Sequence, residues 1–377
     1  MKKLQMVDLK SQYEKIKDEV NASIQEVLET NTYINGPQVH SFQKSLENYL
    51  EVKHVIPCAN GTDALQIAMM GLDLKPGDEV ITADFTFAAT VEVIALLQLT
   101  PVLVDVDLDT MNISIEAIKK AITPKTKAIV PVHLFGRAAN MDAIMEIAAE
   151  YKLFVIEDNA QAIGANFTSK DGWKTKVGII GHVGATSFFP SKNLGCYGDG
   201  GAIFTNDDAL AHTLKGIVNH GMYERYHHDV VGVNSRLDSI QAAVLNAKLP
   251  NLDAYNEARR NAAYKYNSAL SKSSNIVVPE FDYNGDDHVF HQYVIRITNG
   301  KRDALLAHLQ AKEIPCAIYY PIPLHSQKAY ADSRYKEEDF PITNQLCQEV
   351  IALPMHTELE DEQINYITDS ILEFLAP

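Results

Sequence analysis

The chain has 377 residues, of which 46% are hydrophobic and 22% are charged, and its formal net charge is −16 at pH 7. This composition is typical of a globular protein that forms one large domain or two ordinary ones. An acidic chain without a block of lysine and arginine lacks the electrostatic footprint needed to bind nucleic acid or an anionic membrane, so both partner classes are excluded.

The first residues and the cysteines indicate where the protein works. Charged residues at Asp8 and Lys10 interrupt the start before an apolar signal segment can form, and no later window is long enough to span a bilayer. The four cysteines form neither a CxxC pair nor a Cys/His cluster, which is typical of reduced thiols. We therefore expect a cytoplasmic protein without a metal site.

A helical arm precedes the first strand. Apolar residues at positions 8–49 recur every three or four residues, and Asn35-Gly36-Pro37 divides the pattern into two helices. Apolar strands then alternate with helices, which predicts a parallel sheet covered by helices on both faces. The expected strands are 54–59, 79–87, 101–107, 128–134, 153–157, 185–189 and 202–205, and the helices between them are 62–70, 88–97, 114–122 and 141–151.

The last two of these strands are joined differently from the others. Only a loop opened by Pro190 and broken by four glycines separates them, so strand 202–205 should run antiparallel to its neighbour in a mostly parallel, seven-stranded sheet. A helical region at 235–270, broken at Pro250, should then lead into a smaller lobe. That lobe has expected strands at 293–297 and 317–320 and helices at 302–312 and 361–374. The prediction is a large α/β domain at 1–250 and a small α+β domain at 251–377.

Lys192 is the first candidate for chemistry. It lies between the aromatic strand that ends in Phe188-Phe189 and the glycine-rich turn that follows. Partial burial there would lower its pKa from the usual value of about 10.4 and free its lone pair for imine formation. In isolation, such a lysine is more often a solvated loop residue.

Two further strand ends supply complementary groups. At Asn60-Gly61-Thr62-Asp63 a strand gives way to a helix, whose first amide groups can bind an anion such as phosphate. Strand 153–157 ends beside Asp158, at the sheet edge where open α/β folds bind ligands, and a carboxylate there can keep a ring nitrogen protonated. A plain helix cap explains either motif when it is taken alone.

Ser187 and Phe87 complete a set. The Ser187 hydroxyl lies five residues before Lys192 and can bind a phosphate oxygen, while Phe87 ends another strand and can stack on a flat ring. Together the groups meet the requirements of pyridoxal phosphate: an anion site, an acid for the pyridine nitrogen, a stacking face and an amine.

Two rival patterns point to metals. Asp105-Val106-Asp107-Leu108-Asp109 contains the DxD motif of nucleotide-sugar glycosyltransferases, although short acidic runs are common at strand ends. His227-His228 is a possible ligand pair, but adjacent side chains point apart on a regular backbone, so a loop is the better interpretation.

The chain resembles the DegT/DnrJ/EryC1/StrS family of pyridoxal-phosphate sugar aminotransferases along nearly its whole length. The residues that carry the resemblance are Asn35-Gly36, Asn60-Gly61-Thr62-Asp63, Thr86-Phe87, Glu157-Asp158, Ser187-Phe188, Lys192, Gly198-Asp199-Gly200-Gly201 and Asn234-Ser235-Arg236. The resemblance implies the type I, aspartate-aminotransferase-like fold and a homodimer with its sites at the subunit interface.

The resemblance also assigns roles. Lys192 would form the imine with pyridoxal phosphate and Asp158 would pair with its pyridine nitrogen. The remaining cofactor contacts would come from Gly61, Thr62 and Ser187 at the phosphate, Phe87 on the ring, Gln161 near the ring hydroxyl, and Asn234 reaching the phosphate of the neighbouring subunit. The sugar would meet Asn35, Arg236, Tyr319, Tyr320 and His325.

Within the family, the chain looks most like aminotransferases that act on UDP-2-acetamido-2-deoxy-3-oxo-glucuronate. This similarity implies glutamate as the amino donor, amination at C3, and a role in surface polysaccharide (lipopolysaccharide O-antigen) biosynthesis. A carboxylate on C6 of the sugar would need a cation, for which Arg236 is the best candidate unless it only pairs with Asp238 on the surface.

Several alternatives remain open. Tyr319 stands where the resembling uronate enzymes have histidine, so a dTDP-linked 3- or 4-keto-deoxyhexose is the second choice of substrate. A non-catalytic pyridoxal-phosphate-binding regulator, and a sugar dehydratase of the same family with histidine in place of the lysine, are disfavoured by Lys192. A glycosyltransferase would depend on Asp105 and Asp107.

Overall fold

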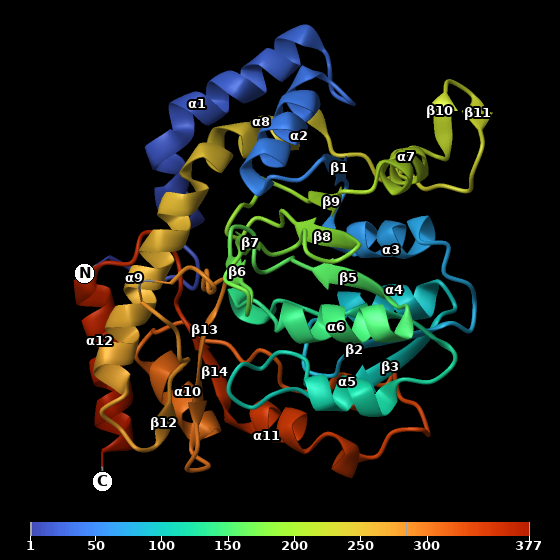
Figure 1. Cartoon of the computed structure of the whole chain (residues 1–377). Helices are drawn as coiled ribbons and strands as arrows, with labels where there is room; N and C mark the ends of the chain where they lie inside the picture. The colour runs from blue at the N-terminus through green and yellow to red at the C-terminus, as the bar shows by residue number, and fades with distance from the viewer. Residues whose placement is uncertain (1, 284, 377) are drawn as a thin grey trace.

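The structure of the protein, a computed structural model, describes residues 2–283 and 285–376. Its central sheet consists of β1 (His54–Cys58), β2 (Glu79–Ala83), β3 (Thr100–Val104), β4 (Thr126–Val130), β5 (Phe154–Asp158), β8 (Val183–Ser187) and β9 (Gly201–Thr205). Their order is β1-β9-β8-β5-β4-β2-β3 (Figure 1). Strand β9 pairs antiparallel with β1 and β8, whereas the other neighbours are parallel. The predicted seven-stranded, mostly parallel sheet is therefore confirmed.

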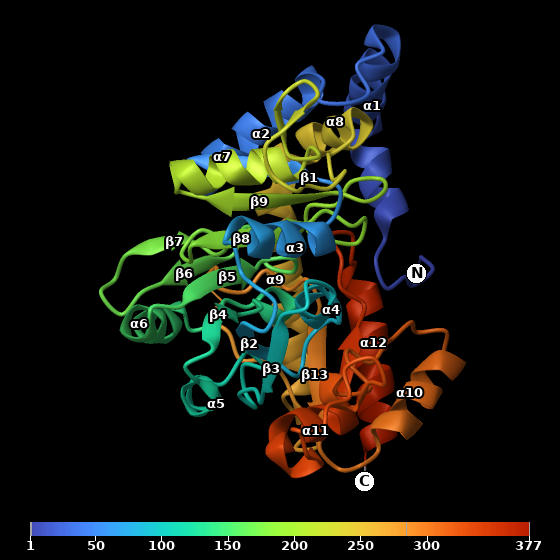
Figure 2. The same cartoon turned by 90° about the vertical axis from the view of Figure 1, so that its right-hand side faces the viewer.

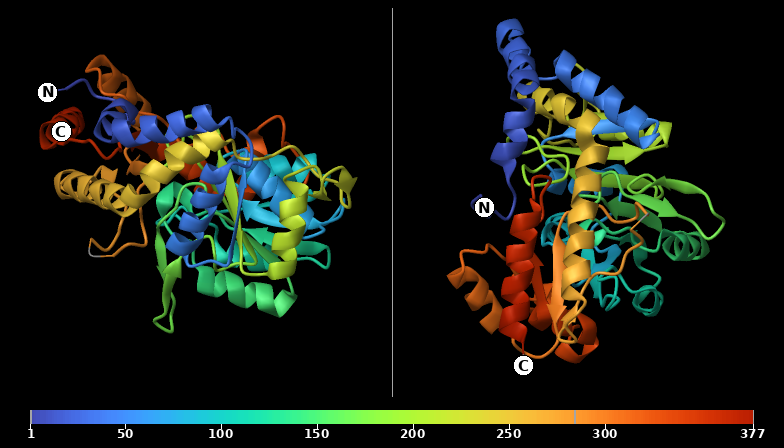
Figure 3. Two further views of the ribbon diagram at one scale, coloured as in Figure 1. Left: turned by 90° about the horizontal axis from the view of Figure 1, so that it is seen from above. Right: turned by 90° about the vertical axis from the view of Figure 1, so that its left-hand side faces the viewer.

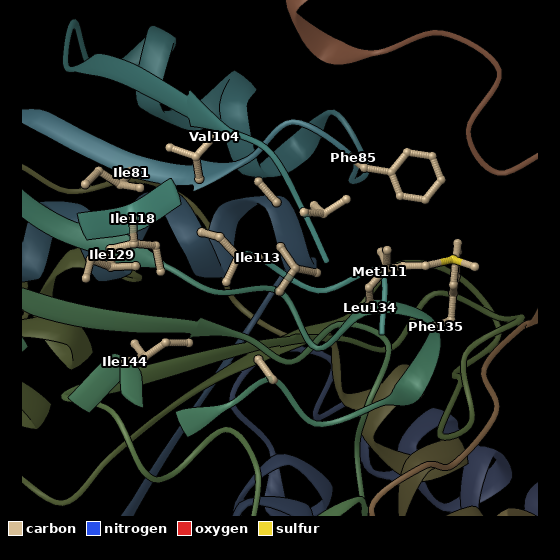
Figure 4. Close-up of a cluster of buried hydrophobic side chains, with 14 of the residues drawn as sticks. Ile81, Phe85, Val104, Met111, Ile113, Ile118, Ile129, Leu134, Phe135 and Ile144 are labelled. Carbon is tan, nitrogen blue, oxygen red and sulfur yellow. The ribbon is translucent and has the colours of Figure 1, made fainter. Parts of the chain in front are cut away.

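Three strands end earlier than the apolar runs of the sequence suggested. The strands end at Ala83, Val104 and Val130, so the expected ends at positions 87, 107 and 134 were wrong. Beyond β4, Val132 forms only an isolated bridge with Asp158. Several apolar residues beyond these points are still buried, because the loops at the carboxyl edge fold over a hydrophobic cluster that contains Phe85 and Leu134 (Figure 4). Burial in a loop and burial in a strand look alike in the sequence.

Helices cover both faces of the sheet. One face packs against α3 (Gly61–Gly71), α4 (Ala89–Leu96) and α7 (Asp208–Ile217) (Figure 2). The other face packs against α5 (Ile115–Ala121) and α6 (Met141–Tyr151) at one end, and against α2 (Pro37–Leu50) and α8 (Ser239–Lys248) at the other. In β1, Val55 packs on the α2 side and Ile56 on the α3 side, as the alternation of side chains along a strand requires.

The N-terminal arm forms two helices, as predicted. Helix α1 (Leu9–Thr30) begins at Asp8, whose side chain accepts a hydrogen bond from the Ser11 amide, and Asn35 in the connection has a left-handed φ of 51°. Ile16 and Val20 of α1 pack against Val244, so α1 lies alongside α8 (Figure 3).

The smaller lobe is built on a three-stranded antiparallel sheet. Its strands are β12 (Ile276–Val277), β13 (Tyr293–Ile297) and β14 (Val350–Leu353), and its helices are α9 (Leu252–Leu270), α10 (Arg302–Ala311), α11 (Pro341–Glu349) and α12 (Asp361–Leu375). The expected strand at 317–320 was wrong, because only Ala317 forms a bridge, to Ala352, while Tyr319 and Tyr320 pack against the cluster beneath the large sheet.

The predicted helix break at Pro250 is confirmed by a short 3₁₀ turn (Leu249–Asn251) between α8 and α9. Helix α9 then belongs to both halves: Leu252 packs in the large domain, whereas Tyr266 and Leu270 lie in the core of the small lobe. The domain division between residues 250 and 251 stays a prediction.

Two hairpins extend from the body. One consists of β6 (Asn166–Thr168) and β7 (Lys174–Lys176), and the other of β10 (Met222–Glu224) and β11 (His227–His228), which projects beyond α7 in Figure 1. The His227-His228 pair, expected in a loop, forms the second strand of that hairpin. Of the helices in the described ranges, none combines the length and apolar character needed to cross a membrane.

Candidate active site

The carboxyl ends of four strands bring the predicted cofactor residues to one edge of the sheet. Asp158 is the last residue of β5 and Ser187 the last of β8, while β1 leads directly to Gly61 and β2 leads to Phe87. All four strands run in the same direction, so these ends share one edge. Open α/β sheets bind their ligands at this edge.

An anion site forms where α3 begins. The Asn60 side chain caps the helix by accepting a hydrogen bond of 2.8 Å from the Asp63 amide. The amides of Gly61 and Thr62 lie in the first turn, where backbone N–H groups have no partner within the helix. A β-carbon added to Gly61 would lie 2.6 Å from Cβ of Ser187, so only glycine lets this turn approach the serine hydroxyl.

Asp158 is a buried carboxylate held by two donors. Thr90 Oγ1 donates to its Oδ2 at 2.8 Å, and the Ala160 amide donates to its Oδ1 at 3.1 Å. Burial raises the pKa of Asp158, whereas these donors and the positive charge of Lys192 lower it. Thr90 did not emerge from the sequence, where its only sign was one polar residue in the apolar run that forms α4.

Lys192 is partly buried in the loop between β8 and β9. Its amide donates to the Phe189 carbonyl at 2.8 Å, which closes a tight turn directly after the strand. Burial lowers the pKa of Lys192 to about 8, and Asp158 opposes that shift. The amine therefore has an uncharged fraction near neutral pH, as imine formation and proton transfer require.

Glu157 and Asp158 serve different purposes, because neighbouring residues of a strand point to opposite faces. Glu157 accepts hydrogen bonds from the amides of Gly178, Ile180 and Gly181 at 2.6 to 2.7 Å. Its Oε2 also lies 2.9 Å from Nε2 of His133, whose Nδ1 accepts from the Ala139 amide. This arrangement holds the strand that carries Asp158, and the sequence showed only that two carboxylates stand side by side.

An aromatic group lies beside these residues. Phe87 is 58% exposed, which is unusual for a phenylalanine and leaves its ring free to stack on a bound ligand. The Tyr320 ring centroid lies 6.4 Å from that of Phe87, and Gln161 Nε2 donates to the Tyr320 hydroxyl at 3.1 Å. Gln161 Oε1 accepts from the Phe135 amide at 2.6 Å, so the predicted contact of Gln161 with a ring hydroxyl stays a prediction.

The predicted sugar-binding residues fall into two groups. The first group lies near the start of α8. Asn35 is in the connection between α1 and α2, where Ile34 forms a bridge with Asp238 and the Gly36 amide donates to Ser239. Arg236 precedes Asp238 by two residues. Arg236 Nη1 donates to Asn219 Oδ1 at 3.2 Å, and its buried Nε has no hydrogen-bond partner among the described residues. Asn234, which is exposed, bridges Asn219 on the same segment.

Tyr319, Tyr320 and His325 form the second group, on the segment that follows Ala317. Nδ1 of His325 lies 2.7 Å from Asp84 Oδ2, its ring stacks on Phe340, and its buried Nε2 has no hydrogen-bond partner within the described ranges. The contact between His325 and Asp84 joins residues 241 positions apart, so no local pattern could have revealed it.

The acidic run and the histidine pair do not gather into a metal site. Asp105 accepts hydrogen bonds from the amides of Ile342 and Thr343 and thereby caps α11, while Asp107 accepts from two amides of its own turn. In the part of the chain that the structure describes, no three His, Cys, Asp or Glu side chains come together as metal ligands.

The residues at the sheet edge fit pyridoxal phosphate. The first turn of α3 and Ser187 offer donors for a phosphate, Phe87 offers a free aromatic face, and Asp158 is a buried carboxylate that can hold a proton on a ring nitrogen. Lys192 supplies an amine with a lowered pKa.

Comparison with known proteins identifies relatives that span the chain. A profile of the DegT/DnrJ/EryC1/StrS aminotransferase family matches residues 14–372. A Pseudomonas aeruginosa protein named UDP-2-acetamido-2-deoxy-3-oxo-D-glucuronate aminotransferase is 46% identical over 97% of this chain and 98% of its own. An Acidithiobacillus ferrooxidans protein named UDP-N-acetyl-3-dehydro-alpha-D-glucosamine 3-aminotransferase is 44% identical over 97% and 96%. A Geobacillus stearothermophilus protein named pleiotropic regulatory protein is 45% identical over 98% of both chains.

Solved structures are similar over the same extent. A DegT DnrJ EryC1 StrS aminotransferase from Brucella abortus has a TM-score of 0.92 at 44% identity and covers 99% of this chain and 100% of its own. DesV of S. venezuelae, in complex with a ketimine intermediate, has a TM-score of 0.94 at 37% identity and covers 100% of both chains. NtdA from Bacillus subtilis, with bound cofactor PMP, has a TM-score of 0.89 at 30% identity and covers 96% of this chain and 82% of its own.

Proposed function

Since this chain belongs to the DegT/DnrJ/EryC1/StrS aminotransferase family, we propose that it transfers an amine from glutamate to C3 of UDP-2-acetamido-2-deoxy-3-oxo-glucuronate. The chain has the type I pyridoxal-phosphate fold and is a pyridoxal-phosphate-dependent nucleotide-sugar aminotransferase. The observation that carries the residue assignment is the pair formed by the partly buried Lys192 and the buried Asp158 at the carboxyl edge of the sheet.

We assign the proton transfers to Lys192. Bound pyridoxal phosphate supplies an electron sink that stabilises negative charge on the carbon that loses a proton. Nζ of Lys192, partly uncharged near neutral pH, would accept the proton from the α-carbon of the amino donor and pass it to the bound cofactor. In the second half-reaction, with the keto sugar, it would move a proton in the opposite direction. Asp158, oriented by Thr90 and Ala160, holds the proton on the ring nitrogen.

The proposed uronate rests on Arg236. Its guanidinium spends one donor on Asn219, while Nε is buried and has no hydrogen-bond partner among the described residues. A buried donor without a partner costs free energy, and a sugar carboxylate would satisfy it. The alternative that Arg236 only pairs with Asp238 is weaker, because its hydrogen bond goes to Asn219.

We further propose that the enzyme works as a homodimer. Asp158 lies at the end of β5 and Lys192 in the loop after β8, whereas Asn234 and Arg236 follow the β10–β11 hairpin. Tyr226 in the turn of that hairpin is 76% exposed and Val231, just after it, is 85% exposed. Such exposed apolar side chains fit a surface that a second copy covers. In the dimer, Asn234 would reach the phosphate at the neighbouring subunit's site.

Comparing kcat/KM for the uronate and for an uncharged analogue tests the uronate proposal. Arg236→Ala should lower kcat/KM for the uronate by about a hundredfold, the effect of removing one partner of a buried charge pair, and should change kcat/KM for UDP-N-acetyl-3-dehydro-glucosamine far less. Arg236→Gln, which keeps a donor but loses the charge, should resemble the alanine variant with the uronate. An equal loss with both sugars would refute the uronate assignment and leave the aminotransferase assignment intact.

A dTDP-linked keto-deoxyhexose remains the second candidate substrate, and preference of the wild-type enzyme for such a sugar would establish it. The relative named as a regulatory protein raises a non-catalytic role, which the lowered pKa of Lys192 does not favour.

We place the reaction in the cytoplasm, in the biosynthesis of a surface polysaccharide such as the lipopolysaccharide O-antigen. Four scattered, free cysteines support that location.

A further inference from the structure

We propose that Lys248 and Gln241 of α8 are positioning residues that clamp the catalytic loop, defined as residues 189–200 between β8 and β9. This inference rests on the proposed role of Lys192, which this loop carries. Neither clamp residue is assigned to the cofactor or the sugar. Both act on the backbone of the loop, within a few residues of Lys192.

Lys248 holds the loop through one buried hydrogen bond. Its side chain is only 1% exposed, and Nζ donates to the Gly195 carbonyl at 2.6 Å. Nζ also lies 5.4 Å from the centre of the Tyr197 ring, a distance at which a cation is attracted to an aromatic face. The Lys248 ammonium therefore binds the loop backbone at Gly195, three residues after Lys192.

Gln241 holds the same loop two residues further on. Its Oε1 accepts a hydrogen bond of 2.9 Å from the Tyr197 amide. A β-carbon added to Gly198 would lie 2.8 Å from Gln241 Nε2, so the loop can approach this side chain only because it has glycine there. Residues 241 and 248 are seven positions apart, which places them on one side of α8, two turns from each other.

A buried ammonium is costly, which indicates that Lys248 serves more than packing. Burial lowers the pKa of Lys248 to about 8, and the groups that act on its charge are the thiol of Cys196 and the guanidinium of Arg259. Neither group is a carboxylate that would neutralise it. Replacing such a group with an apolar side chain of similar volume is often neutral or stabilising. If Lys248 only filled space, an apolar residue would fit here at lower cost, so we infer that its ammonium has a further role.

The clamp acts through position and not through charge. The charged group that acts on the Lys192 amine is Asp158, so removal of the Lys248 charge should not by itself change the pKa of Lys192. The loop is tightly folded: a β-carbon on Gly195 would meet the Pro190 carbonyl oxygen at 2.4 Å, and the Cys196 amide donates back to the Phe188 carbonyl at 2.8 Å. A tether at Gly195 is thus transmitted directly to the turn that presents Lys192.

Lys248→Met separates the clamp from a packing role. We expect the thermal midpoint of the variant to stay close to that of the wild type, because removal of a buried ammonium offsets the lost hydrogen bond to the Gly195 carbonyl. In the apoenzyme, hydrogen exchange of the amides in residues 189–200 should be about tenfold faster, the size of effect that one hydrogen bond to a charged group supports. In the holoenzyme, kcat should fall by a similar factor while KM for the sugar changes less than twofold. Lys272→Met, at an exposed lysine after α9, is the matched control.

Gln241→Leu provides the second variant if Lys248→Met fails to fold, and it should also speed exchange in the loop. Unchanged loop exchange in both variants, or a fall in kcat no larger than in the Lys272→Met control, would overturn the clamp. The proposed function fails separately: a wild-type holoenzyme without imine absorbance would refute the role of Lys192, while exchange in the apoenzyme would still report on the clamp.

Discussion

The hydrogen bond from Thr90 to Asp158 predicts a pH-dependent loss of stability when it is removed. In Thr90→Val the shape of the side chain is kept, but the donor 2.8 Å from Asp158 Oδ2 is lost. A hydrogen bond to a charged group contributes about 1.5 to 3 kcal/mol, so the variant should lose about 2 kcal/mol when Asp158 is ionised. Thr82→Val is the matched control, because Thr82 is equally buried and donates at 2.8 Å to the neutral Val130 carbonyl.

The sign of the pH effect follows from the direction of the pKa shift. Burial raises the pKa of Asp158 above its ordinary value of 3.8, and Thr90 opposes that rise. The raised pKa means that stability falls as pH rises from 3.8 through the folded-state pKa. Without Thr90 that pKa rises further, so the decline in stability extends to higher pH.

Urea unfolding of the apoenzyme from pH 4.5 to pH 8 measures this difference. The stability gap between the wild type and Thr90→Val should widen by about 1 kcal/mol as pH rises, while the gap for Thr82→Val stays constant near 1 kcal/mol. A gap for Thr90→Val that does not depend on pH would refute the claim that Asp158 is a charged group supported by Thr90.

Two other substitutions probe the site. Gly61→Ala places a β-carbon 2.6 Å from Ser187 Cβ, so the affinity of the apoenzyme for pyridoxal phosphate should fall at least about tenfold in a fluorescence titration, and unchanged affinity would remove Gly61 from the phosphate site. In Glu157→Gln, the new side-chain NH₂ group would face backbone amides that now donate to the carboxylate. The free energy of unfolding, measured by chemical denaturation, should therefore fall by about 3 kcal/mol or more. A fall below about 1 kcal/mol would contradict the buried network.

The fold was predictable where one local signal decides the structure. The alternation of apolar strands and helices was enough to predict the parallel sheet, and the glycine-rich loop after Pro190 predicted the antiparallel β9. The segment 317–320 failed because its apolar and aromatic residues are buried against the large domain and not within a ladder. A sequence shows that such residues are buried but not what covers them.

The residues of the candidate site were predictable for the same reason, but the partners that hold them in place were not. Lys192, Asp158 and Gly61 each stand at the end of a strand, so chain order alone places them at the sheet edge. The partners that support them come from far away in the sequence: Thr90 lies 68 positions from Asp158, and Lys248 lies 53 positions from Gly195. Those contacts depend on how the helices pack, which no local pattern encodes.

The most direct test of the account is the absorbance of the cofactor-loaded enzyme during addition of the aminated product, the UDP-linked 2-acetamido-3-amino uronate. The wild type should show the imine absorbance of Lys192, and saturating product should discharge it as the amine is transferred. Lys192→Ala should show neither the absorbance nor turnover. Imine absorbance and turnover in Lys192→Ala, or a wild-type absorbance that no nucleotide-linked amino sugar alters, would contradict the account.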